Sequence, residues 1–324
     1  MRAVRPVTPG IPNEIEVVDV PVPEPGAGEV VVRVAAAGLN RADLLQMRGG
    51  YPPPAGESSI PGLECAGRIE KLGEGVDAYS RGDRVMALLS GGGQAELVAV
   101  PEGQLMPWPE SLSAAEAGGL PEAALTAWTN LVVEGGLRSG ESVLVTGATS
   151  GVGSFAVQLA RELGARVIAA GRDEARLKAM SGFDLEEHVV LGESFVDDVH
   201  ALTDGRGVDL VLDLVGGEWT AKAIDALAPH GRLVLVGLTA GAKAHVDLTH
   251  VLRRQLKIVG SLLRIRTRAE KATLVRAFSS FAAARFDDGR LKPVVHRTYP
   301  LAEAASAYAA LAAGGFTGKL VLIP

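Results

Sequence analysis

A glycine-rich turn is the first feature of the sequence whose residues could bind a ligand. The segment 146–153 reads TGATSGVG; it follows an apolar run that predicts a strand, Ser142–Thr146, and leads into helical spacing over 153–163. Without Cβ atoms the backbone can approach phosphate oxygens closely, and free amides at a helix start favour negative charge. The spacing G-x-x-x-G-x-G differs from the dinucleotide-binding motif G-x-G-x-x-G. The prediction of a binding site therefore depends on the position of the turn between a strand and a helix. We expect the pyrophosphate of a dinucleotide here; a purely structural turn is the alternative, but it leaves three glycines at one junction unexplained.

The end of the next predicted strand, 166–170, indicates which dinucleotide is bound. Enzymes that select the unphosphorylated ribose usually place Asp or Glu about 20 residues beyond the glycine turn. Here the strand is followed by Gly171 and Arg172, with Arg176 one helical turn later. Glycine leaves room, and guanidinium groups suit phosphate oxygens because they form bidentate hydrogen bonds. If the two acidic residues after Arg172 are the first turn of the following helix, the sequence favours NADPH; the alternative is that both arginines are only solvated.

Strand-like and helix-like segments alternate strictly around this turn. Several strands are apolar at every position, which is typical of a parallel sheet covered by helices on both faces. We therefore expect an α/β fold with a doubly wound parallel six-strand domain over residues 121–259. The predicted strands are Ser142–Thr146, Arg166–Ala170, His188–Leu191, Val208–Leu214, Arg232–Val236 and Leu256–Ser261. The predicted helices are Gly153–Leu163, Glu174–Met180, Ser194–Leu202, Glu218–Leu227 and Leu248–Arg254.

The two remaining parts of the chain have a different texture. Residues 1–120 contain short β-rich runs separated by glycine and proline, so this third is predicted to be mainly β. Ser113 and Glu116 fit a capping box, and the Ala/Leu-rich stretch after them predicts helical structure to about Val133. Residues 260–324 are too few for a separate domain, and we expect them to fold back onto the first third. Their predicted elements are a helix at 268–285, a strand at 291–299, a helix at 301–313 and a strand at 318–323.

Composition excludes several classes of protein. The residues are 47% hydrophobic and 22% charged, which is typical of globular proteins. A chain of 324 residues is too long for one ordinary core. A net charge of −6 argues against binding to nucleic acid or an anionic membrane surface, which needs a basic field. The single cysteine, Cys65, excludes an intramolecular disulfide and a multi-cysteine metal cluster. Because no signal-peptide core or membrane-length apolar run is found, we expect a soluble cytoplasmic protein.

Six segments carry a specific resemblance to a known family. Over its full length the chain resembles the medium-chain dehydrogenase/reductase family, and in particular its zinc-free quinone oxidoreductase (zeta-crystallin-like) branch. The resemblance implies a Rossmann domain over 121–259 and a mainly β GroES-like catalytic domain formed by 1–120 and 260–324. The matching segments are AGLNRAD (37–43), PGLECAG (61–67), GEGV (73–76), GDRV (82–85), TGATSGVG (146–153) and GKLV (318–321).

Two of these segments differ from those of the zinc-bearing members of the family. Those members have a cysteine in the first segment and a Gly-His-Glu triplet in the second. This sequence has Asn40 in place of the cysteine and Leu63 in place of the histidine, and it lacks the four-cysteine structural lobe. An amide and an alkyl group do not hold zinc, so we expect a metal-free site. Without a Lewis acid to stabilise an alkoxide, reduction of an electron-poor acceptor is the easier reaction.

Asn40 and Tyr51 are the candidate catalytic residues, because the resemblance places both beside the nicotinamide. Such a site needs to stack the acceptor and to hydrogen-bond its developing enolate-like oxygen. Tyr51 precedes three prolines, so we expect it on a stiff, exposed loop as an orienting donor or, less readily, a proton source; packing on those prolines is the alternative. Asn40 could equally cap the helix predicted over 40–48. Asp43 is expected to tie down the loop near Asn40 and not to act as a base.

The resemblance also implies which residues contact the cofactor. They are a nicotinamide-side residue in the segment 125–128, the pyrophosphate turn, the ends of the second, fourth and fifth strands of the doubly wound sheet, and two basic residues of the tail that close over the cofactor. In that order they are Thr126; Ser150, Gly151 and Val152; Gly171, Arg172, Arg176, Gly217 and Leu238; Arg264 and Lys319.

The sequence therefore leads to one expected activity and two alternatives. We expect NADPH-dependent, metal-free reduction of quinones by hydride or electron transfer, with the acceptor in the cleft between the domains. Reduction of the carbon–carbon double bond of enones or enals is one alternative, and a catalytically idle NADPH-binding structural protein is the other. The strand 256–261 should lie at a sheet edge, which invites pairing. Since the family commonly dimerises through that edge, we expect a homodimer.

Overall fold

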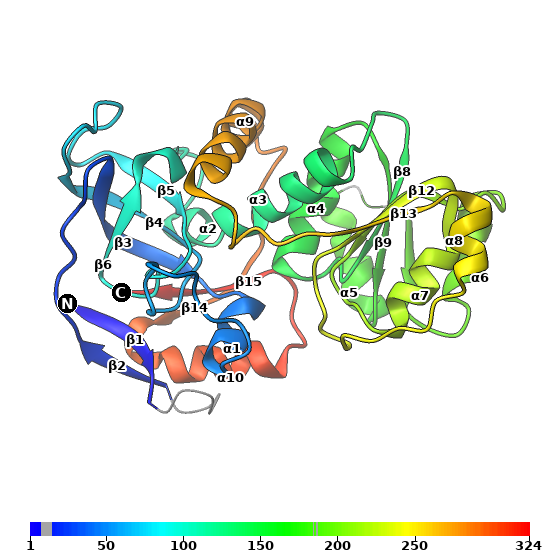
Figure 1. The fold of residues 1–324 in the computed structure, drawn as a ribbon, viewed down its shortest axis with the longest axis horizontal. Coiled ribbons are helices and arrows are strands. Elements are labelled where there is room, and N and C mark those ends of the chain that lie inside the picture. Colours follow the sequence, from blue (N-terminus) through cyan, green and yellow to red (C-terminus); the bar gives the residue numbers. More distant parts are fainter. Residues whose placement is uncertain (8–14, 184, 186) are drawn as a thin grey trace. The chain divides into compact units, whose positions relative to one another are not determined.

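The computed structural model describes residues 1–7, 15–183, 185 and 187–324, which form two compact units (Figure 1). Unit 1 consists of Met1–Leu125 together with Leu263–Pro324, and unit 2 is the continuous segment Thr126–Leu262. Unit 1 is thus discontinuous in sequence. None of the helices described is both long and apolar enough to cross a membrane.

Unit 2 is built on a six-stranded parallel sheet with the strand order β10-β9-β8-β11-β12-β13, which confirms the predicted doubly wound fold. The order reverses between β8 and β11. Because crossover connections are right-handed, the connections on the two sides of this point place their helices on opposite faces of the sheet. Ligands of such sheets bind at the carboxyl ends of the strands where the order reverses. The strands are β8 (Ser142–Thr146), β9 (Arg166–Gly171), β10 (Glu187–Val190), β11 (Val208–Asp213), β12 (Leu227–Leu235) and β13 (Lys257–Gly260).

The core of unit 2 explains the apolar runs within several of the predicted strands. All five residues of β8 are buried, because helices cover the sheet on both sides. Leu144, Ile168 and Ile224 join Phe195 in one buried cluster, and each such side chain contributes about 1.5–3 kcal/mol by leaving water. The helices are α4 (Gly151–Glu162), α5 (Glu174–Lys178), α6 (Phe195–Leu202), α7 (Glu218–Asp225) and α8 (Leu248–Arg254).

Unit 1 contains a seven-stranded, mostly antiparallel sheet in the order β14-β15-β3-β4-β5-β7, with β6 paired with β3. The tail strand β15 pairs with β3 through Val321 opposite Gly38, so the tail and the first third form one sheet, as expected. A separate pair, β1 (Arg2–Pro6) and β2 (Ile15–Asp19), is antiparallel. The sheet strands are β3 (Glu29–Gly38), β4 (Glu64–Leu72), β5 (Arg84–Leu88), β6 (Leu97–Pro101), β7 (Leu105–Pro107), β14 (Val295–Pro300) and β15 (Lys319–Ile323).

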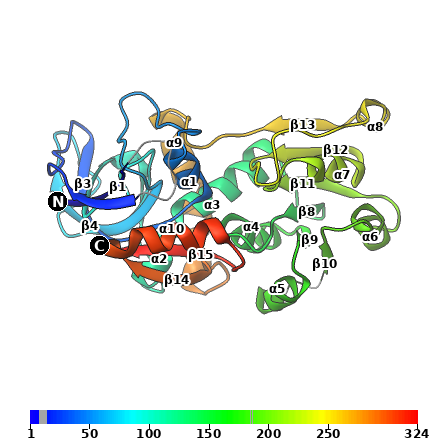
Figure 2. The same cartoon turned by 90° about the horizontal axis from the view of Figure 1, so that it is seen from below.

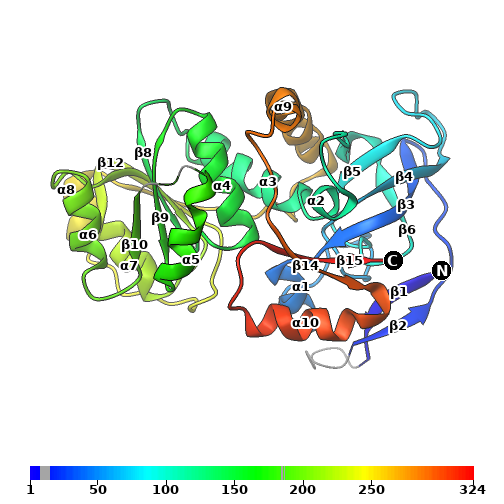
Figure 3. The ribbon, with the colours of Figure 1, turned by 180° about the vertical axis from the view of Figure 1, so that it is seen from behind.

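Helices of unit 1 cover this sheet. Helix α10 (Ala304–Ala313) lies along β14 and β15, and its Tyr308 and Leu311 share a buried cluster with Leu320 (Figures 2 and 3). The same cluster takes in Leu44 of α1, so helices from both ends of the chain meet on one side of the sheet. The remaining helices are α1 (Arg41–Met47), α2 (Ala114–Gly118), α3 (Pro121–Trp128), whose last residues belong to unit 2, and α9 (Arg268–Asp287).

Helical structure extends to Glu134 through a π-helical stretch, Thr129–Glu134, close to the end predicted near Val133, but it is interrupted. The capping box of Ser113 and Glu116 is present, but α2 ends at Gly118 and α3 begins anew at Pro121. Proline lacks the N–H that would continue a helix, yet it suits the first helical position. The short strands β1 and β7 were not predicted, because three to five residues give too little periodicity to recognise.

Candidate functional site

The glycine turn of unit 2 folds as a tight strand-to-helix junction. Gly147 has φ +67°, and a Cβ at Gly153 would come within 2.3 Å of the Gly147 carbonyl oxygen, so neither position accepts a side chain without distortion. Ser150 is the N-cap of α4, and its Oγ accepts the Gly153 N–H at 3.0 Å. The Gly151 and Val152 N–H groups lie in the first turn of α4, where a helix offers them no acceptor. These residues fit the phosphates of a dinucleotide.

A buried aspartate that the sequence reasoning missed organises the edge beside this turn. Asp213, at the end of β11, is fully buried and accepts hydrogen bonds from Thr146 Oγ1 at 2.7 Å and Thr220 Oγ1 at 2.6 Å. The backbone N–H groups of Val215 and Gly216 also donate to its Oδ1. With these donors the carboxylate is satisfied internally. Asp213 therefore fixes the loop after β11 to the end of β8 and to α7.

The two arginines at the end of β9 differ in their surroundings. Arg172 is exposed, whereas the Arg176 Nε lies 2.9 Å from Asp173 Oδ2. Asp173 is the N-cap of α5 and accepts the Arg176 N–H, and these hydrogen bonds lower its pKa. The acidic residue after Arg172 thus starts the helix, as the sequence indicated. A Cβ at Gly171 would approach Leu177 to 3.2 Å, so the strand end packs closely on its own helix.

The other residues predicted in unit 2 lie on helix α3 and beyond the sheet's strand ends. Thr126 is 6% exposed in α3, where its carbonyl accepts a hydrogen bond from Asn130. Gly217 has φ +63° and precedes α7 as its N-cap, and Leu238 follows β12 and is 52% exposed. Their contact with a cofactor stays a prediction.

Unit 1 brings together three buried side chains from distant parts of the chain, and the ammonium group of one of them is bonded to the other two. Glu64 begins β4, Asn40 is the N-cap of α1 and Lys319 begins β15; all three are at most 9% exposed. Glu64 Oε1 accepts from Lys319 Nζ and, at 2.9 Å, from Asn40 Nδ2, while Lys319 Nζ donates to Asn40 Oδ1 at 2.5 Å. A Cβ at Gly38 would lie 2.2 Å from Glu64 Oε1, so only glycine at 38 leaves room for this carboxylate.

Asp43 ties down the surrounding loop, the role the sequence predicted. Its Oδ2 accepts the Asn40 N–H at 2.7 Å and Gln94 Nε2 at 3.3 Å, and its Oδ1 accepts the Gly62 N–H at 3.1 Å. Gln94 in turn accepts the Tyr308 hydroxyl at 2.7 Å. Burial raises the pKa of Asp43 to about 6, against the opposing effect of the two backbone hydrogen bonds.

Glu122, in the first turn of α3, completes the polar cluster. Its backbone N–H donates to Glu64 Oε2 at 2.8 Å. Its own Oε2 is buried, and no described residue hydrogen-bonds to it. Burial, followed by the repulsion of Glu64, raises the pKa of Glu122 to about 8. The raised pKa favours the protonated form of this carboxyl group at neutral pH.

The loop around Tyr51 is largely exposed, as the sequence predicted, but the Tyr51 side chain is partly buried beneath Arg264. The Arg264 guanidinium carbon lies 5.1 Å from the centre of the Tyr51 ring, a cation–π distance, and Arg264 Nη1 donates to the Tyr51 carbonyl at 3.0 Å. Arg264 also donates to the Ser90 carbonyl at 2.8 Å and to Gln46 Oε1 at 2.6 Å. Burial raises the pKa of Tyr51, so its phenol remains a hydrogen-bond donor at neutral pH. Arg264 thus holds the Tyr51 loop.

Lys271 of α9 holds Arg264 and Ser90 in place through hydrogen bonds. It is 2% exposed, and its Nζ donates to the Arg264 carbonyl at 2.8 Å and to Ser90 Oγ. Burial lowers the pKa of both Lys271 and Arg264. Whether Arg264 and Lys319 also reach the cofactor, as the resemblance implied, stays a prediction.

Family models match segments of both units, and related proteins match the whole chain. A model of the alcohol dehydrogenase GroES-like domain matches residues 26–110, and a model described as zinc-binding dehydrogenase matches 151–280. The quinone oxidoreductase of Mus musculus is 30% identical over 329 residues, covering 100% of this chain and 98% of that protein. The structure of the Thermus thermophilus quinone oxidoreductase, also solved with NADPH, superposes with a TM-score of 0.84 at 36% identity and covers 100% of both chains.

The chain belongs to the quinone oxidoreductase branch of the medium-chain dehydrogenase/reductase family. A phenolphthiocerol/phthiocerol polyketide synthase of Mycobacterium tuberculosis is also 32% identical over 320 residues, or 97% of this chain. This chain spans only 14% of the length of that relative.

The zinc of other dehydrogenases in this family does not fit the residues of unit 1. Asn40 and Leu63 stand where those enzymes have a cysteine and a histidine, and an alkyl side chain is no ligand. Lys319 Nζ already occupies the oxygens of Asn40 and Glu64, and an ammonium there opposes a second cation. Cys65, next to Glu64, is fully buried, and burial raises the pKa of its thiol, which disfavours the thiolate that metals bind.

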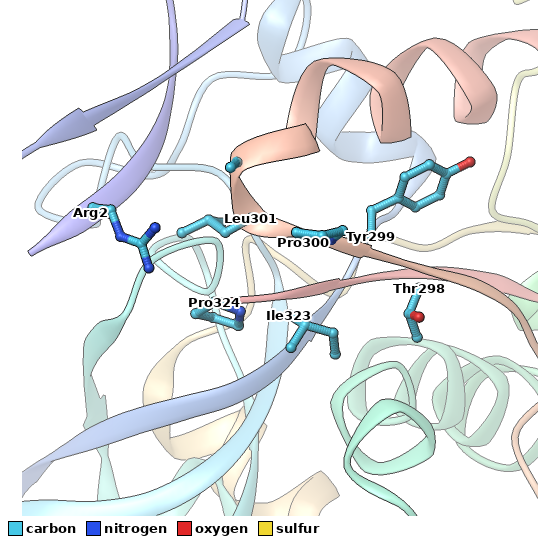
Figure 4. A pocket seen from close by; sticks show the side chains of 8 residues that line it. Arg2, Thr298, Tyr299, Pro300, Leu301, Ile323 and Pro324 are labelled. Atoms are coloured by element: carbon cyan, nitrogen blue, oxygen red, sulfur yellow. The ribbon is translucent and has the colours of Figure 1, made fainter.

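A surface hollow elsewhere in unit 1 carries no comparable chemistry (Figure 4). It has a volume of about 460 Å³ and lies between the ends of β14 and β15, where Pro300, Leu301 and Ile323 line it. Its Arg2 is already paired with Glu96 at 2.8 Å. None of the predicted catalytic or cofactor residues lines this hollow.

Four residues that form these buried polar clusters escaped the sequence reasoning: Glu64, Glu122, Asp213 and Lys271. Asp213 could have been found, because a charged residue at the buried end of a strand needs partners. Glu64 also lies inside an apolar segment, which gives the same signal. Glu122 and Lys271 sit in ordinary helical sequence, where an acidic first turn and a lysine predict only solvated charge.

Proposed function

We propose that this protein is an NADPH-dependent reductase of quinones that works without a metal ion. The observation that carries the proposal is the replacement of the family's metal ligands by Asn40 and Leu63, with the Lys319 ammonium bonded between Asn40 and Glu64. An acceptor that is already electron-poor needs no Lewis acid. The similarity to quinone oxidoreductases from mouse and Thermus thermophilus supports the same acceptor class.

The cofactor would be held by residues of unit 2. Bound NADPH supplies the hydride, and the protein provides position and electrostatics. The first-turn amides of α4 would hold the pyrophosphate, with Ser150 keeping that turn in shape. Arg172 and Arg176 would take the 2′-phosphate, and the exposure of Arg172 leaves its guanidinium accessible for that contact.

Unit 1 would orient the acceptor. The Tyr51 phenol would donate a hydrogen bond to the oxygen on which charge develops, and Arg264 would keep its ring and backbone in place. Asn40 Nδ2 has two hydrogens, of which Glu64 takes one. The other could be offered to the acceptor.

We also propose a homodimer formed through β13, which is an edge strand of its sheet. Ile258 on this strand is 47% exposed, and Leu248 and Leu252 of α8 are 73% and 78% exposed. Exposed apolar side chains beside an unpaired strand edge favour pairing with a second copy.

The test is oxidation of NADPH followed with ortho- and para-quinones beside a panel of enones and enals. We expect turnover with quinones, and Tyr51→Phe should lower kcat about tenfold while the Kd for NADPH stays unchanged, since one hydrogen bond to a charged atom is lost. Tyr79→Phe is the matched control, because that hydroxyl binds the Leu105 carbonyl. Turnover of enones alone would reassign the activity, and tight NADPH binding without any turnover would leave only a binding protein.

A further inference from the structure

Three carboxyl groups of unit 1 compete for few hydrogen-bond donors. Glu64 accepts from Lys319, from Asn40 and from the Glu122 N–H. Asp43 accepts from two backbone N–H groups and from Gln94. Glu122 Oε2 is buried and accepts from no described residue. A buried, unpaired carboxylate oxygen is costly, so the geometry makes Glu122 the member of this set that keeps its proton.

The charged surroundings of Glu122 lead to the same assignment. Two anionic neighbours raise its pKa and two cationic neighbours lower it, with burial the largest cause of its rise to about 8. The Glu122 backbone N–H and Asn40 Nδ2 donate to the same Glu64 carboxylate, which connects the acid to a residue proposed to orient the acceptor. The charge of Glu122 also affects the pKa values of Tyr51 and Arg264. The titratable groups that face Glu122 are Glu64 of β4, Asp43 of α1, Lys319 of β15, Lys271 of α9, Tyr51 and Arg264.

Glu122 is the one of these three acidic residues that is not wholly enclosed. The residue as a whole is partly exposed, although its Oε2 is buried. A group that is wholly enclosed could give up a proton once but could not regain it at each turnover. Asp43 and Glu64 are fully buried.

We propose that Glu122 is the acid that supplies the proton taken up by the reduced acceptor at Tyr51 and Asn40. The inference rests on the proposed function, which supplies the hydride. Reduction of a para-quinone by hydride leaves one product oxygen as a phenolate. An O–H bond forms on that oxygen as the Glu122 O–H bond breaks, the electron pair of the broken bond stays on the Glu122 carboxylate, and water then returns a proton to it.

The direction of this transfer is favourable. An ordinary phenol has a pKa of about 10, roughly two units above the value of about 8 for Glu122, so the proton prefers the phenolate about 100-fold. Tyr51 alone would be a poorer source, because burial raises its pKa further above that of an ordinary phenol. Tyr51 can relay the proton or merely orient the oxygen.

Two measurements on the full-length protein test this role, one of which needs no turnover. Infrared difference spectra between about pH 7 and about pH 9 bracket the Glu122 pKa of about 8 and report the carbonyl stretch of a protonated carboxyl group. The second is the pH profile of kcat for NADPH with a para-benzoquinone. Both are made on wild type, on Glu122→Gln and on the control Glu110→Gln, which changes an exposed glutamate of the same unit.

We expect wild type and Glu110→Gln to show a band that is lost on raising the pH, and Glu122→Gln to lack it. In wild type kcat should fall about tenfold per pH unit above about 8. Glu122→Gln should lose that fall and be about 100-fold slower at pH 7, with an unchanged Kd for NADPH. Glutamine keeps the backbone bond to Glu64 and the shape of the acid. Should it nevertheless fail to fold, Glu122→Asp serves instead, and its band should shift in frequency.

Three results would overturn the inference, and they differ from a failure of the proposed function. No titrating band in wild type would show that Glu122 is ionised. A band that persists in Glu122→Gln but disappears in Glu64→Gln would place the proton on Glu64. An alkaline fall in kcat that survives Glu122→Gln would assign the proton to another donor. If wild type shows the band but reduces no acceptor, the proposed function fails, and proton delivery fails with it.

Discussion

The raised pKa of Glu122 makes the stability of unit 1 depend on pH in a direction opposite to that of most carboxyl groups. In the unfolded chain Glu122 titrates near 4.5, and in the folded protein near 8. Between these values the folded protein holds a proton that the unfolded chain has lost. The free energy of unfolding contributed by this group therefore falls as the pH rises through that window, is fully lost above about 8, and is unaffected below about 4.5.

The size of this effect follows from the same two pKa values. pH 7 lies about 2.5 units above the pKa of Glu122 in the unfolded chain. At about 1.4 kcal/mol per pH unit, this difference gives about 3.4 kcal/mol. Because this free energy follows from the two pKa values, we expect it to be roughly 3 kcal/mol. Glu122→Gln cannot ionise. Relative to wild type, it should gain this amount of stability between about pH 4.5 and pH 7.

Urea unfolding at several pH values, with hydrogen exchange of the β4 and β5 amides to report on unit 1, measures the difference. The control is Glu110→Gln, which removes an exposed glutamate of the same unit and should not reproduce the pH-dependent difference. A difference between Glu122→Gln and wild type that does not change with pH would refute the reasoning. So would a relative loss of stability as the pH rises.

Three further outcomes are expected. Lys319→Met should cost about 3–5 kcal/mol in urea unfolding, because it leaves Glu64 buried without its cation, and adding Glu64→Gln should recover part of the loss; a cost below about 1 kcal/mol would contradict the buried pair. Arg172→Ala with Arg176→Ala should weaken NADPH about 10- to 100-fold and NADH hardly at all by titration, whereas equal losses would mean that neither arginine reads the 2′-phosphate. Ile258→Lys should convert dimer to monomer in sedimentation without loss of helical signal, and an unchanged sedimentation coefficient would place the interface elsewhere.

The parts of the fold that the sequence predicted are those with strong local signals. The central strands of unit 2 are mostly apolar because both faces of the sheet are buried there, and β8 was predicted with its observed bounds, Ser142–Thr146. The capping box of Ser113 and Glu116 and the helix α8 likewise depend on neighbouring residues alone. The end of α2 could have been predicted from Pro121, whose effect on a continuing helix is also local.

The polar cluster of unit 1 could be predicted only in pieces. Asn40 and Asp43 lie in one short segment, and their mutual bond is a local capping interaction. Glu64 and Lys319 are 255 residues apart, and no spacing rule relates two residues brought together by non-adjacent strands of a sheet. The proton on Glu122 depends on which donors its neighbours have already taken. Such a competition exists only in three dimensions.

The ammonium group that joins Asn40 and Glu64 is added to the growing polypeptide 279 residues after Asn40. During translation the β-rich first part must therefore wait, with Glu64 lacking its cation, until strand β15 has left the ribosome, whereas the uninterrupted segment Thr126–Leu262 can acquire its structure earlier. Shortening the message so that synthesis stops before Lys319 should release a polypeptide whose nucleotide-binding half is folded and whose other half depends on chaperones.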